Sequence, residues 1–236
     1  MGTVVRGMLE RGYRGMRLAA GVDPSAGADE KNMYGALEEF DGAADVILDF
    51  SHHTCTESLT EYAVSRGLPV VIATTGQTEA ELEMIRAAAE KIPVFLSANM
   101  SLGIAVLAKF ARLAAAVMPE AEVEIVETHH NKKIDAPSGT ALMLARAVQS
   151  SLPDSELVFG RSGNKKRGKN EIGMHSLRIG GVVGEHEVII SSGEEIITLK
   201  HTAGSRTLFA EGALTAAGFL AGKPAGIYTM DDVVGD

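Results

Sequence analysis

The chain has 236 residues, 45% of them hydrophobic, and a formal net charge of −9 at pH 7. This length fits one large domain or two small ones, and the negative charge argues against nucleic acid as a general partner, because phosphate binding needs a basic surface. The single cysteine, Cys55, excludes an internal disulfide and fits a reducing compartment. No apolar run reaches the ~18 residues of a membrane helix, and no signal peptide precedes the globular pattern. We therefore expect a soluble, cytoplasmic protein, and we interpret the basic cluster at residues 161–169 as a local feature of a loop.

Short apolar segments alternate with helical patterns through the first hundred residues. This alternation predicts βαβ units and a parallel sheet. The strands lack polar alternation, as expected when helices cover both faces of a sheet. The pattern therefore predicts an α/β fold with a Rossmann-like dinucleotide-binding domain. The expected helices span residues 1–12, 54–66 and 78–91, and the expected strands span residues 17–22, 45–50, 69–73 and 94–96.

Ligand sites on such sheets lie at the carboxyl ends of the strands. Four segments hold these positions here, namely residues 23–24, 50–51, 74–76 and 97–100. Asp23 could accept hydrogen bonds from ribose hydroxyls, or it could simply open a turn before Pro24. Residues 74–76 could contact a ligand or form a capping turn that leads into the helix at Thr78.

The start of the chain lacks most of the expected phosphate-binding fingerprint. A dinucleotide-binding fold opens with a strand and a G-x-x-G-x-x-G loop whose backbone holds the pyrophosphate. The sequence begins Met1-Gly2-Thr3-Val4, which matches only the last residues of that fingerprint and the helix after it. We therefore expect a dinucleotide-binding domain whose first strand is missing.

The remainder of the chain predicts an α+β unit with an open mixed sheet, whose strands alternate polar and apolar residues. Its strands are expected at residues 122–128, 173–180, 187–192 and 195–201, with residues 184–186 as a turn and a helix at residues 141–149. A long helix at residues 101–118 has an apolar stripe typical of a core, formed by Ile104, Leu107, Phe110, Leu113 and Ala114.

The last helix is expected at residues 208–221. Arg206 either closes over a ligand or caps that helix. We expect one domain at residues 1–100 and 208–236, and a second domain at residues 101–207.

The stretch 129–140 joins the strand at residues 122–128 to the helix at residues 141–149. Ser138 or Thr140 could cap this helix, and Pro137 fits its first turn because its missing N–H would have no partner there. A second interpretation is that free N–H groups at Ser138, Gly139 and Thr140 form an anion site, where the glycine lets the backbone approach a ligand closely.

The same stretch carries His129, His130 and Lys133, which add positive charge and transferable protons. Asp135 could orient Lys133 or cap the helix. The two histidines are adjacent, so on an extended strand their rings point to opposite sides and cannot hold one metal ion together. We expect no catalytic metal.

Residues 127–141 read Glu-Thr-His-His-Asn-Lys-Lys-Ile-Asp-Ala-Pro-Ser-Gly-Thr-Ala, which closely resembles the signature of the dihydrodipicolinate reductase family. Residues 183–186, Val-Gly-Glu-His, and the C-terminal residues 226–234 resemble the family as well, so the resemblance covers nearly the whole chain. It implies reduction of 4-hydroxy-tetrahydrodipicolinate to tetrahydrodipicolinate by NADH or NADPH, in lysine and diaminopimelate biosynthesis. It also implies a homotetramer in which residues 101–207 bind substrate and their sheet packs against its copies, which would account for Val188, Ile190, Ile196 and Leu199.

The resemblance further implies roles for single residues. The amides of Ser138, Gly139 and Thr140 would hold a substrate carboxylate, with His130 and Lys133 nearby. A hydride would arrive at ring C4 as water is lost, and either His129 or Lys133 would deliver the proton that follows. The residues that would contact the cofactor are Met1, Asp23, Ala73, Thr74, Thr75, Ser97, Ala98, Asn99 and Met100.

Cofactor preference and catalysis stay open at this point. Asp23 favours an unphosphorylated ribose, whereas Lys31 and Arg17 could meet a 2′-phosphate. An alternative to the reductase is a homologue that binds a cyclic dicarboxylate without hydride transfer, because most of the phosphate loop is missing. The length of the match at residues 129–140 disfavours a different dehydrogenase on the same scaffold.

Overall fold

The structure is a computed structural model that describes residues 1–25 and 31–235. The chain divides into two compact units. Unit 1 holds residues 1–100 with 207–236, and unit 2 holds residues 101–206. The expected domain boundaries, after residue 100 and before residue 208, lie within one residue of this division.

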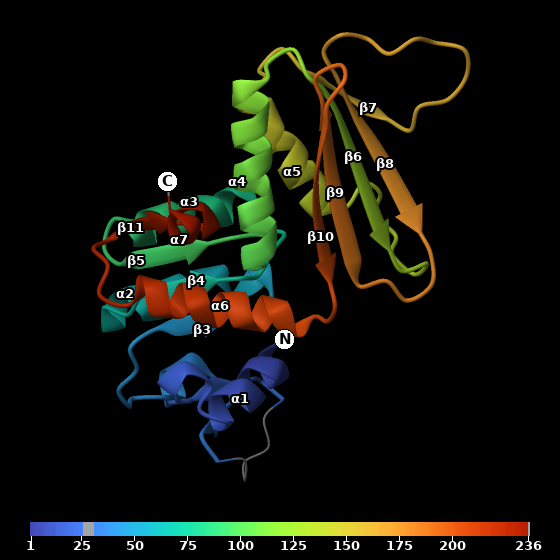
Figure 1. The fold of residues 1–236 in the computed structure, drawn as a ribbon. Helices are drawn as coiled ribbons and strands as arrows, with labels where there is room; N and C mark the ends of the chain where they lie inside the picture. The colour runs from blue at the N-terminus through green and yellow to red at the C-terminus, as the bar shows by residue number, and fades with distance from the viewer. Residues whose placement is uncertain (26–30, 236) are drawn as a thin grey trace. The chain divides into compact units, whose positions relative to one another are not determined.

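Unit 1 is built on a parallel sheet with the strand order β11-β5-β4-β3, shown in Figure 1. The prediction of a Rossmann-like α/β fold is confirmed. The elements of unit 1 are α1 (Gly2–Glu10), η1 (Tyr13–Gly15), β1 (Gly21–Val22), β2 (Met33–Tyr34), η2 (Leu37–Glu39), β3 (Ile47–Asp49), η3 (His53–Cys55), α2 (Thr56–Arg66), β4 (Val70–Ile72), α3 (Glu79–Ala89), β5 (Pro93–Leu96), α6 (Thr207–Leu220), β11 (Gly226–Tyr228) and α7 (Met230–Val234).

The core of unit 1 is aliphatic and uses small side chains for close packing. On one side of the sheet, Ala63 of α2 and Ile85 of α3 are fully buried against Val70 and Val94. Helix α6 contacts β3, β4 and β5. Because helices cover both faces, all three residues of β4 are buried, which explains the apolar runs in the sequence.

The strand expected at residues 17–22 is shorter than predicted and lies outside the main sheet. Only Gly21 and Val22 form β1, which pairs in parallel with β2. Within the described part of the chain, this pair is a separate two-stranded sheet. Strands β2 and β11 were not predicted, because two or three residues are too few to show a periodic pattern.

Unit 2 contains a mixed five-stranded sheet with the order β10-β9-β6-β8-β7. Strand β6 pairs in parallel with β8 and antiparallel with β9, which confirms the predicted mixed sheet. Helices α4 and α5 cover one face (Figure 1) and bury Ile104 and Leu144 against Ile125 and Val188. The elements of unit 2 are α4 (Leu102–Val117), β6 (Glu122–His129), α5 (Gly139–Gln149), β7 (Glu156–Phe159), β8 (Glu171–Arg178), β9 (Gly184–Ser191) and β10 (Ile196–Ala203).

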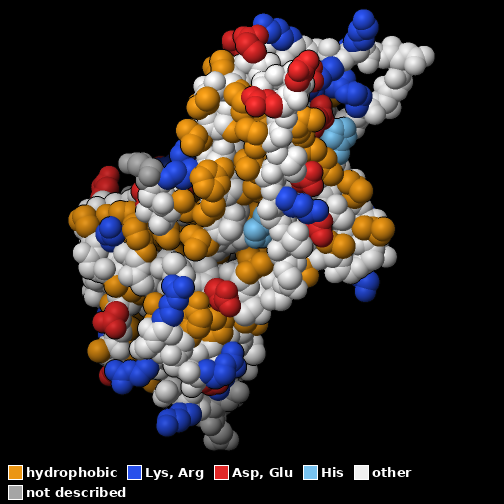
Figure 2. Space-filling model, viewed as in Figure 1, with side chains coloured by type: hydrophobic (Ala, Val, Ile, Leu, Met, Phe, Trp, Pro, Cys, Tyr) orange, Lys and Arg blue, Asp and Glu red, His pale blue; other side chains and the backbone are white. Residues whose placement is uncertain are grey.

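The core stripe predicted for α4 is partly wrong. Phe110 and Leu113 are 51% and 56% exposed, while Ala111 and Ala115 are fully buried against the sheet. Helix α4 is apolar on most of its sides, so hydrophobic spacing alone could not select the buried face. Figure 2 shows the resulting hydrophobic side chains on the outer face of α4.

Two predictions about β9 and β10 are also wrong. Residues 184–186 are the first residues of β9 and not a turn, because Gly184 pairs with Ala203 of β10. Val188 and Ile190 are buried under the helices, so they are not available to pack against another sheet. Ile196 is 65% exposed and, opposite Ser191 in the register, lies on the uncovered face.

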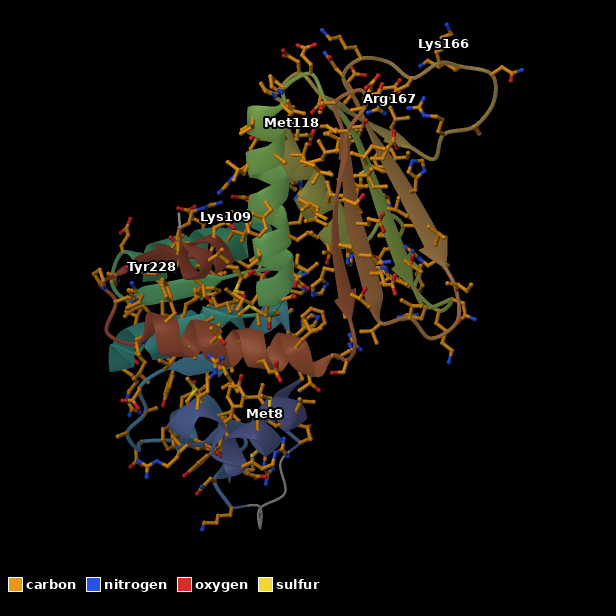
Figure 3. All side chains as sticks on the ribbon, viewed as in Figure 1. Met8, Lys109, Met118, Lys166, Arg167 and Tyr228 are labelled. Carbon is orange, nitrogen blue, oxygen red and sulfur yellow. The ribbon has the colours of Figure 1, made fainter. Side chains whose placement is uncertain are left out.

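The basic cluster at residues 161–169 is a local feature of the loop between β7 and β8, as predicted; Figure 3 labels two of its side chains, Lys166 and Arg167. Arg167 pairs with Glu124, Arg161 with Glu171, and Lys169 with Glu120. These carboxylates take up much of the positive charge of the loop. Within the described chain, no helix is long and apolar enough to span a membrane.

Gly212 of α6 provides a test of packing in unit 1. A Cβ atom at this position would lie 1.6 Å from the backbone oxygen of Met100. We expect Gly212→Ala to lower the free energy of unfolding by about 2–3 kcal/mol, the scale of an overpacked core. The matched control is Gly218→Ala in the same helix, whose Cβ would meet only the flexible end of Met16. Urea unfolding of both variants measures the difference, and equal stability would contradict the close packing of α6.

Candidate active site

A polar row continues the helix-facing side of β6 toward its carboxyl end. Val123 and Ile125 point into the core, and the same alternation brings in Glu127 and His129, both buried. Because the alternation is unbroken, these two charged or polar side chains share one face with the hydrophobic core.

The neighbouring strands supply partners at the same level. Glu127 lies between Ser176 of β8 and His186 of β9 in the register, and His129 lies opposite Arg178 of β8. One face of three strands therefore gathers an acid, an arginine and two histidines beside the N-terminus of α5.

Glu127 is the centre of this group, with a side chain only 1% exposed. Arg178 donates two hydrogen bonds to it, Nη1 to Oε2 at 2.9 Å and Nη2 to Oε1 at 2.8 Å. The amide of Ser138 donates to Oε1 at 3.2 Å, and Nδ1 of His129 contacts Oε2. A buried carboxylate needs such partners, because an unpaired charge would be costly to desolvate.

These partners keep Glu127 ionised. Burial alone would raise the pKa of Glu127, but hydrogen bonds from Arg178, Ser176 and His129 outweigh it and lower the pKa to about 2. A group that stays charged near neutral pH is a fixed acceptor and not a proton donor. Glu127 is therefore suited to orient its neighbours.

His129 is oriented by this acceptor. An ionised carboxylate can only accept hydrogen bonds, so Nδ1 of His129 carries a proton and Nε2 is the nitrogen left for chemistry. Nε2 faces Gly184 of β9, where a Cβ atom would approach it to 3.1 Å. The absence of a side chain at Gly184 therefore keeps space open beside Nε2.

Ser138 is the N-cap of α5. Its Oγ accepts the amide of Ala141 at 3.1 Å and lies 3.2 Å from Nε2 of His186. The prediction of a free amide at Ser138 is wrong, because Glu127 accepts it. Pro137 is not in the first helical turn either; it precedes the cap, since α5 begins at Gly139.

Gly139 occupies the tip of α5 in open surroundings. A Cβ atom there would meet nothing within 4 Å. As the first residue of the helix it has no acceptor for its amide within the helix, and the helix dipole favours negative charge at this end. Thr140, the next residue, is half-buried in the same turn. The helix tip could therefore receive an anion.

His186 is buried and neutral. Burial lowers the pKa of His186 to about 4, and its ring lies edge-on to His129 with centroids 5.1 Å apart. Among the described atoms, none is a hydrogen-bond partner for its Nδ1. His186 therefore supports Ser138 without adding charge next to His129.

Lys133 and His130 lie in the loop after β6. The Lys133 ammonium is 2.9 Å from Oδ1 of Asp135, and Arg178 holds the same loop by donating to the Asp135 carbonyl at 2.6 Å. Of the two roles expected for Asp135, pairing with Lys133 is observed, while Ser138 caps the helix. Nδ1 of His130 is buried without a hydrogen-bond partner among the described residues.

The residues expected to bind a cofactor follow strands of unit 1. Ala73, Thr74 and Thr75 follow β4, and the Thr74 hydroxyl is buried with no hydrogen-bond partner in the described chain. A buried hydroxyl at the carboxyl end of a parallel strand fits a dinucleotide, whose polar groups would satisfy it. Asp23 follows β1 but accepts two hydrogen bonds from Ser25 through Oδ1, as in the expected turn.

The residues after β5 form a tight turn. Ser97 donates to the Asn99 carbonyl at 2.8 Å, Ala98 is exposed, and Met100 is buried. Met1 is 38% exposed next to the start of α1. Across residues 1–25 and 31–235, no three His, Cys, Asp or Glu side chains are grouped to hold a metal ion.

Sequence reasoning did not assign roles to Glu127, Arg178 and His186. The sequence did contain a signal for each of them. In each strand the charged or polar residue lies an even number of positions from buried apolar residues, so it faces the core. In β6, for example, Glu127 continues the series Val123 and Ile125.

Comparison with known proteins identifies relatives over nearly the whole chain. Residues 1–100 match the family model "Dihydrodipicolinate reductase, N-terminus", and residues 103–234 match "Dihydrodipicolinate reductase, C-terminus". The chain is 47% identical to the 4-hydroxy-tetrahydrodipicolinate reductase of Caldanaerobacter subterraneus over 99% of this chain and 94% of the relative. It is also 47% identical to the enzyme of that name from Clostridium novyi, over 94% and 89% of the two chains.

A solved structure shares the fold. The dipicolinate-bound dihydrodipicolinate reductase of Paenisporosarcina sp. TG-14 matches with a TM-score of 0.81 at 24% identity, covering 97% of this chain and 93% of that one.

The buried His186 makes stability depend on pH. Its pKa lies near 4 in the folded protein and near 6.5 in the unfolded chain, so the unfolded chain binds the extra proton as the pH falls through this window. We expect the free energy of unfolding to drop by about 2–3 kcal/mol between pH 7 and pH 4 from this group alone. His186→Gln should remove that part of the drop, whereas the half-buried His175→Gln should not. Urea unfolding at several pH values measures both, and parallel profiles for wild type and His186→Gln would contradict a buried neutral imidazole.

Proposed function

Because this chain belongs to the dihydrodipicolinate reductase family, we propose that it reduces 4-hydroxy-tetrahydrodipicolinate to tetrahydrodipicolinate with NADH or NADPH, a reaction of lysine and diaminopimelate biosynthesis. The observation that carries the proposal is the buried Glu127–Arg178 pair, which holds His129 at the N-terminus of α5. This arrangement supports a role for His129 as a proton donor and for the helix N-terminus as an anion site, as a dicarboxylate substrate requires.

The helix end is proposed to bind one substrate carboxylate. The amides of Gly139 and Thr140, together with the Ser138 hydroxyl, are in the first turn of α5, where hydrogen-bond donors and the helix dipole favour negative charge. Lys133 and His130 would add donors from the preceding loop. The Ser138 amide is excluded from this role, because Glu127 already accepts its hydrogen bond.

His129 and Lys133 are proposed to handle the protons of the reaction. Loss of the 4-hydroxyl as water gives one proton to the leaving oxygen and releases one from the carbon next to C4, and that carbon regains a proton once C4 has received the hydride, so one proton is consumed overall. A bound nicotinamide supplies the hydride for C4. His129 is suited to deliver a proton from Nε2, because the contact of Nδ1 with Glu127 fixes the orientation of the ring. Lys133 lies in the loop that follows β6, where its ammonium group pairs with Asp135. It is the second candidate for the proton donor.

Unit 1 is proposed to hold the cofactor at the carboxyl ends of its parallel strands. The buried Thr74 hydroxyl supports this placement, with Ala73 and Thr75 beside it and residues 97–100 after the next strand. Asp23, which follows β1, would accept from a ribose hydroxyl, and Met1 lies next to the start of α1. We propose a cytoplasmic location, supported by the single cysteine.

We propose that four copies assemble through the uncovered face of the unit 2 sheet. The exposed Leu177 and Ile196 lie on that face, 47% and 65% exposed, and α4 and α5 cover the other face. Lys200 pairs with Glu185 there at 3.1 Å, so the surface combines apolar and charged groups. Exposed apolar side chains on a sheet face favour association, and charged groups beside them can pair across the interface.

The double variant Leu177→Glu, Ile196→Glu tests the tetramer. Two new charges on a buried sheet face would have to be desolvated, so we expect dissociation into smaller species. Light scattering after size-exclusion chromatography should give about four times the 24.8 kDa of one chain for wild type. Val117→Glu, on the 72% exposed end of α4, is the control and should keep the wild-type mass. A wild-type monomer would contradict the proposal.

Variants of the proposed proton donors test the reaction. We expect His129→Gln and Lys133→Ala to lower turnover by roughly 10²-fold or more, because each loses a general acid. The control is Lys132→Ala, an exposed neighbour in the same loop. The assay follows NADH or NADPH oxidation with substrate formed from pyruvate and aspartate semialdehyde.

A protein that binds a cyclic dicarboxylate without hydride transfer is separated from the reductase by calorimetry. Such a binder would bind pyridine-2,6-dicarboxylate but neither NADH nor NADPH.

Wild-type turnover in both His129→Gln and Lys133→Ala would refute the assignment of His129 and Lys133 as proton donors.

A further inference from the structure

In unit 1, two loops at the carboxyl edge of the main sheet are tied together by His53 and Glu81. Strands β3 and β4 are parallel neighbours, with Asp49 opposite Ile72 in the register. After β3 the chain enters η3, which begins at His53, and after β4 it forms a loop of residues 73–78 that leads into α3. Glu81 is in the first turn of α3. The contact therefore joins segments that follow adjacent strands.

The Glu81 carboxylate serves both loops at once. His53 Nδ1 lies 2.9 Å from Oε1 and 3.0 Å from Oε2. Oε2 also accepts the amide of Thr78 at 2.6 Å and its hydroxyl at 2.9 Å, which completes a capping box on α3. The hydrogen bond from the Thr78 backbone, and then the one from His53, lower the pKa of Glu81. The carboxylate is therefore an ionised acceptor that joins His53 to the start of α3.

The 73–78 loop is held along its length. Gly76 has a φ of +92°, and a Cβ atom there would lie 3.8 Å from the His53 ring. The Gln77 side-chain amide donates to the Thr74 carbonyl at 2.8 Å. The loop thus presents the Thr74 hydroxyl, which is buried and lacks a hydrogen-bond partner among the described residues. This orphaned hydroxyl points to a ligand, since buried hydroxyls are normally paired.

We propose that His53 and Glu81 are positioning residues for the nicotinamide dinucleotide: their contact fixes the 73–78 loop so that Thr74 meets the cofactor, and it sets cofactor affinity. The inference rests on the proposed function, because it takes the loop after β4 as part of the cofactor site. Neither side chain has to touch the reacting atoms. Because the contact orders the 73–78 loop before the cofactor binds, binding does not lose the conformational entropy of that loop. Losing the contact should therefore weaken cofactor binding.

Three substitutions separate the contact from the helix cap. His53→Ala removes the contact but leaves the Thr78–Glu81 capping box. Glu81→Gln keeps an acceptor and a capping side chain but removes the charge. The matched control is Glu79→Gln, the same change two residues earlier in the same helix, where the side chain is 78% exposed and pairs with Arg86.

Calorimetry with NADH and, separately, with pyridine-2,6-dicarboxylate gives the readout, and steady-state kinetics adds KM and kcat. We expect His53→Ala and Glu81→Gln to raise the Kd and the KM for NADH by about 5- to 10-fold, the scale of one charge-assisted hydrogen bond at a partly exposed site. Their Kd for the dicarboxylate and their kcat at saturating NADH should stay within about twofold of wild type, as should all values for Glu79→Gln. His53→Gln, whose amide can still donate to Glu81, should recover part of the affinity.

Unchanged NADH affinity in His53→Ala and Glu81→Gln would overturn the inference while the reductase assignment stands. Equal weakening of NADH and dicarboxylate binding would also overturn it, because a general loss of structure would then explain the result. Wild-type protein that binds no NADH or NADPH would remove the proposed function, and the inference with it.

Discussion

A buried negative charge at Glu127 constrains most of the unit 2 site. The carboxylate is only 1% exposed, and breaking a buried pair of this kind is strongly destabilising, because it leaves an uncompensated charge. The bidentate contact from Arg178 supplies the opposite charge, and Arg178 also binds the Asp135 carbonyl. The same acceptor takes the Ser138 amide and orients His129. The strand, the loop and the helix N-terminus are therefore positioned by the requirement to satisfy one carboxylate.

The order of the strands explains why the sequence alone identified only some of the residues around Glu127. The sequence identified His129, Lys133 and the Ser138–Thr140 turn, because these residues lie in one contiguous stretch. Arg178 and His186 come from β8 and β9, which flank β6 although they follow it by some fifty residues. Local periodicity carries no information on which strand pairs with which. The alternation within β6 was a usable signal for the burial of Glu127, but its partners depended on the register.

The fold was more predictable than the detailed packing. The alternation of apolar strands and helices in residues 1–100 predicted the parallel sheet, because helix-covered strands must be apolar on both faces. Helix α4 was harder, since a helix that is apolar on most sides has no unique stripe, and Phe110 was assigned to the core although it is exposed. Val188 was assigned to an outer face for a related reason: the sequence shows that β9 alternates, but not which of its faces the helices cover.

In both units a glutamate links a histidine to the N-terminal end of a helix, but the contacts differ in strength. In each, a glutamate accepts a hydrogen bond from an amide at the N-terminal end of a helix and also contacts a histidine: Glu127 with Ser138 and His129, and Glu81 with Thr78 and His53. Glu127 also has an arginine and almost no contact with solvent, so its contacts are strong and their geometry is rigid. The side chain of Glu81 is 15% exposed and that of His53 is 27% exposed, so solvent screens their attraction. A strong contact suits the role proposed for His129 as a proton donor, whereas a weaker one suits the role proposed for the 73–78 loop, which would admit and release a cofactor.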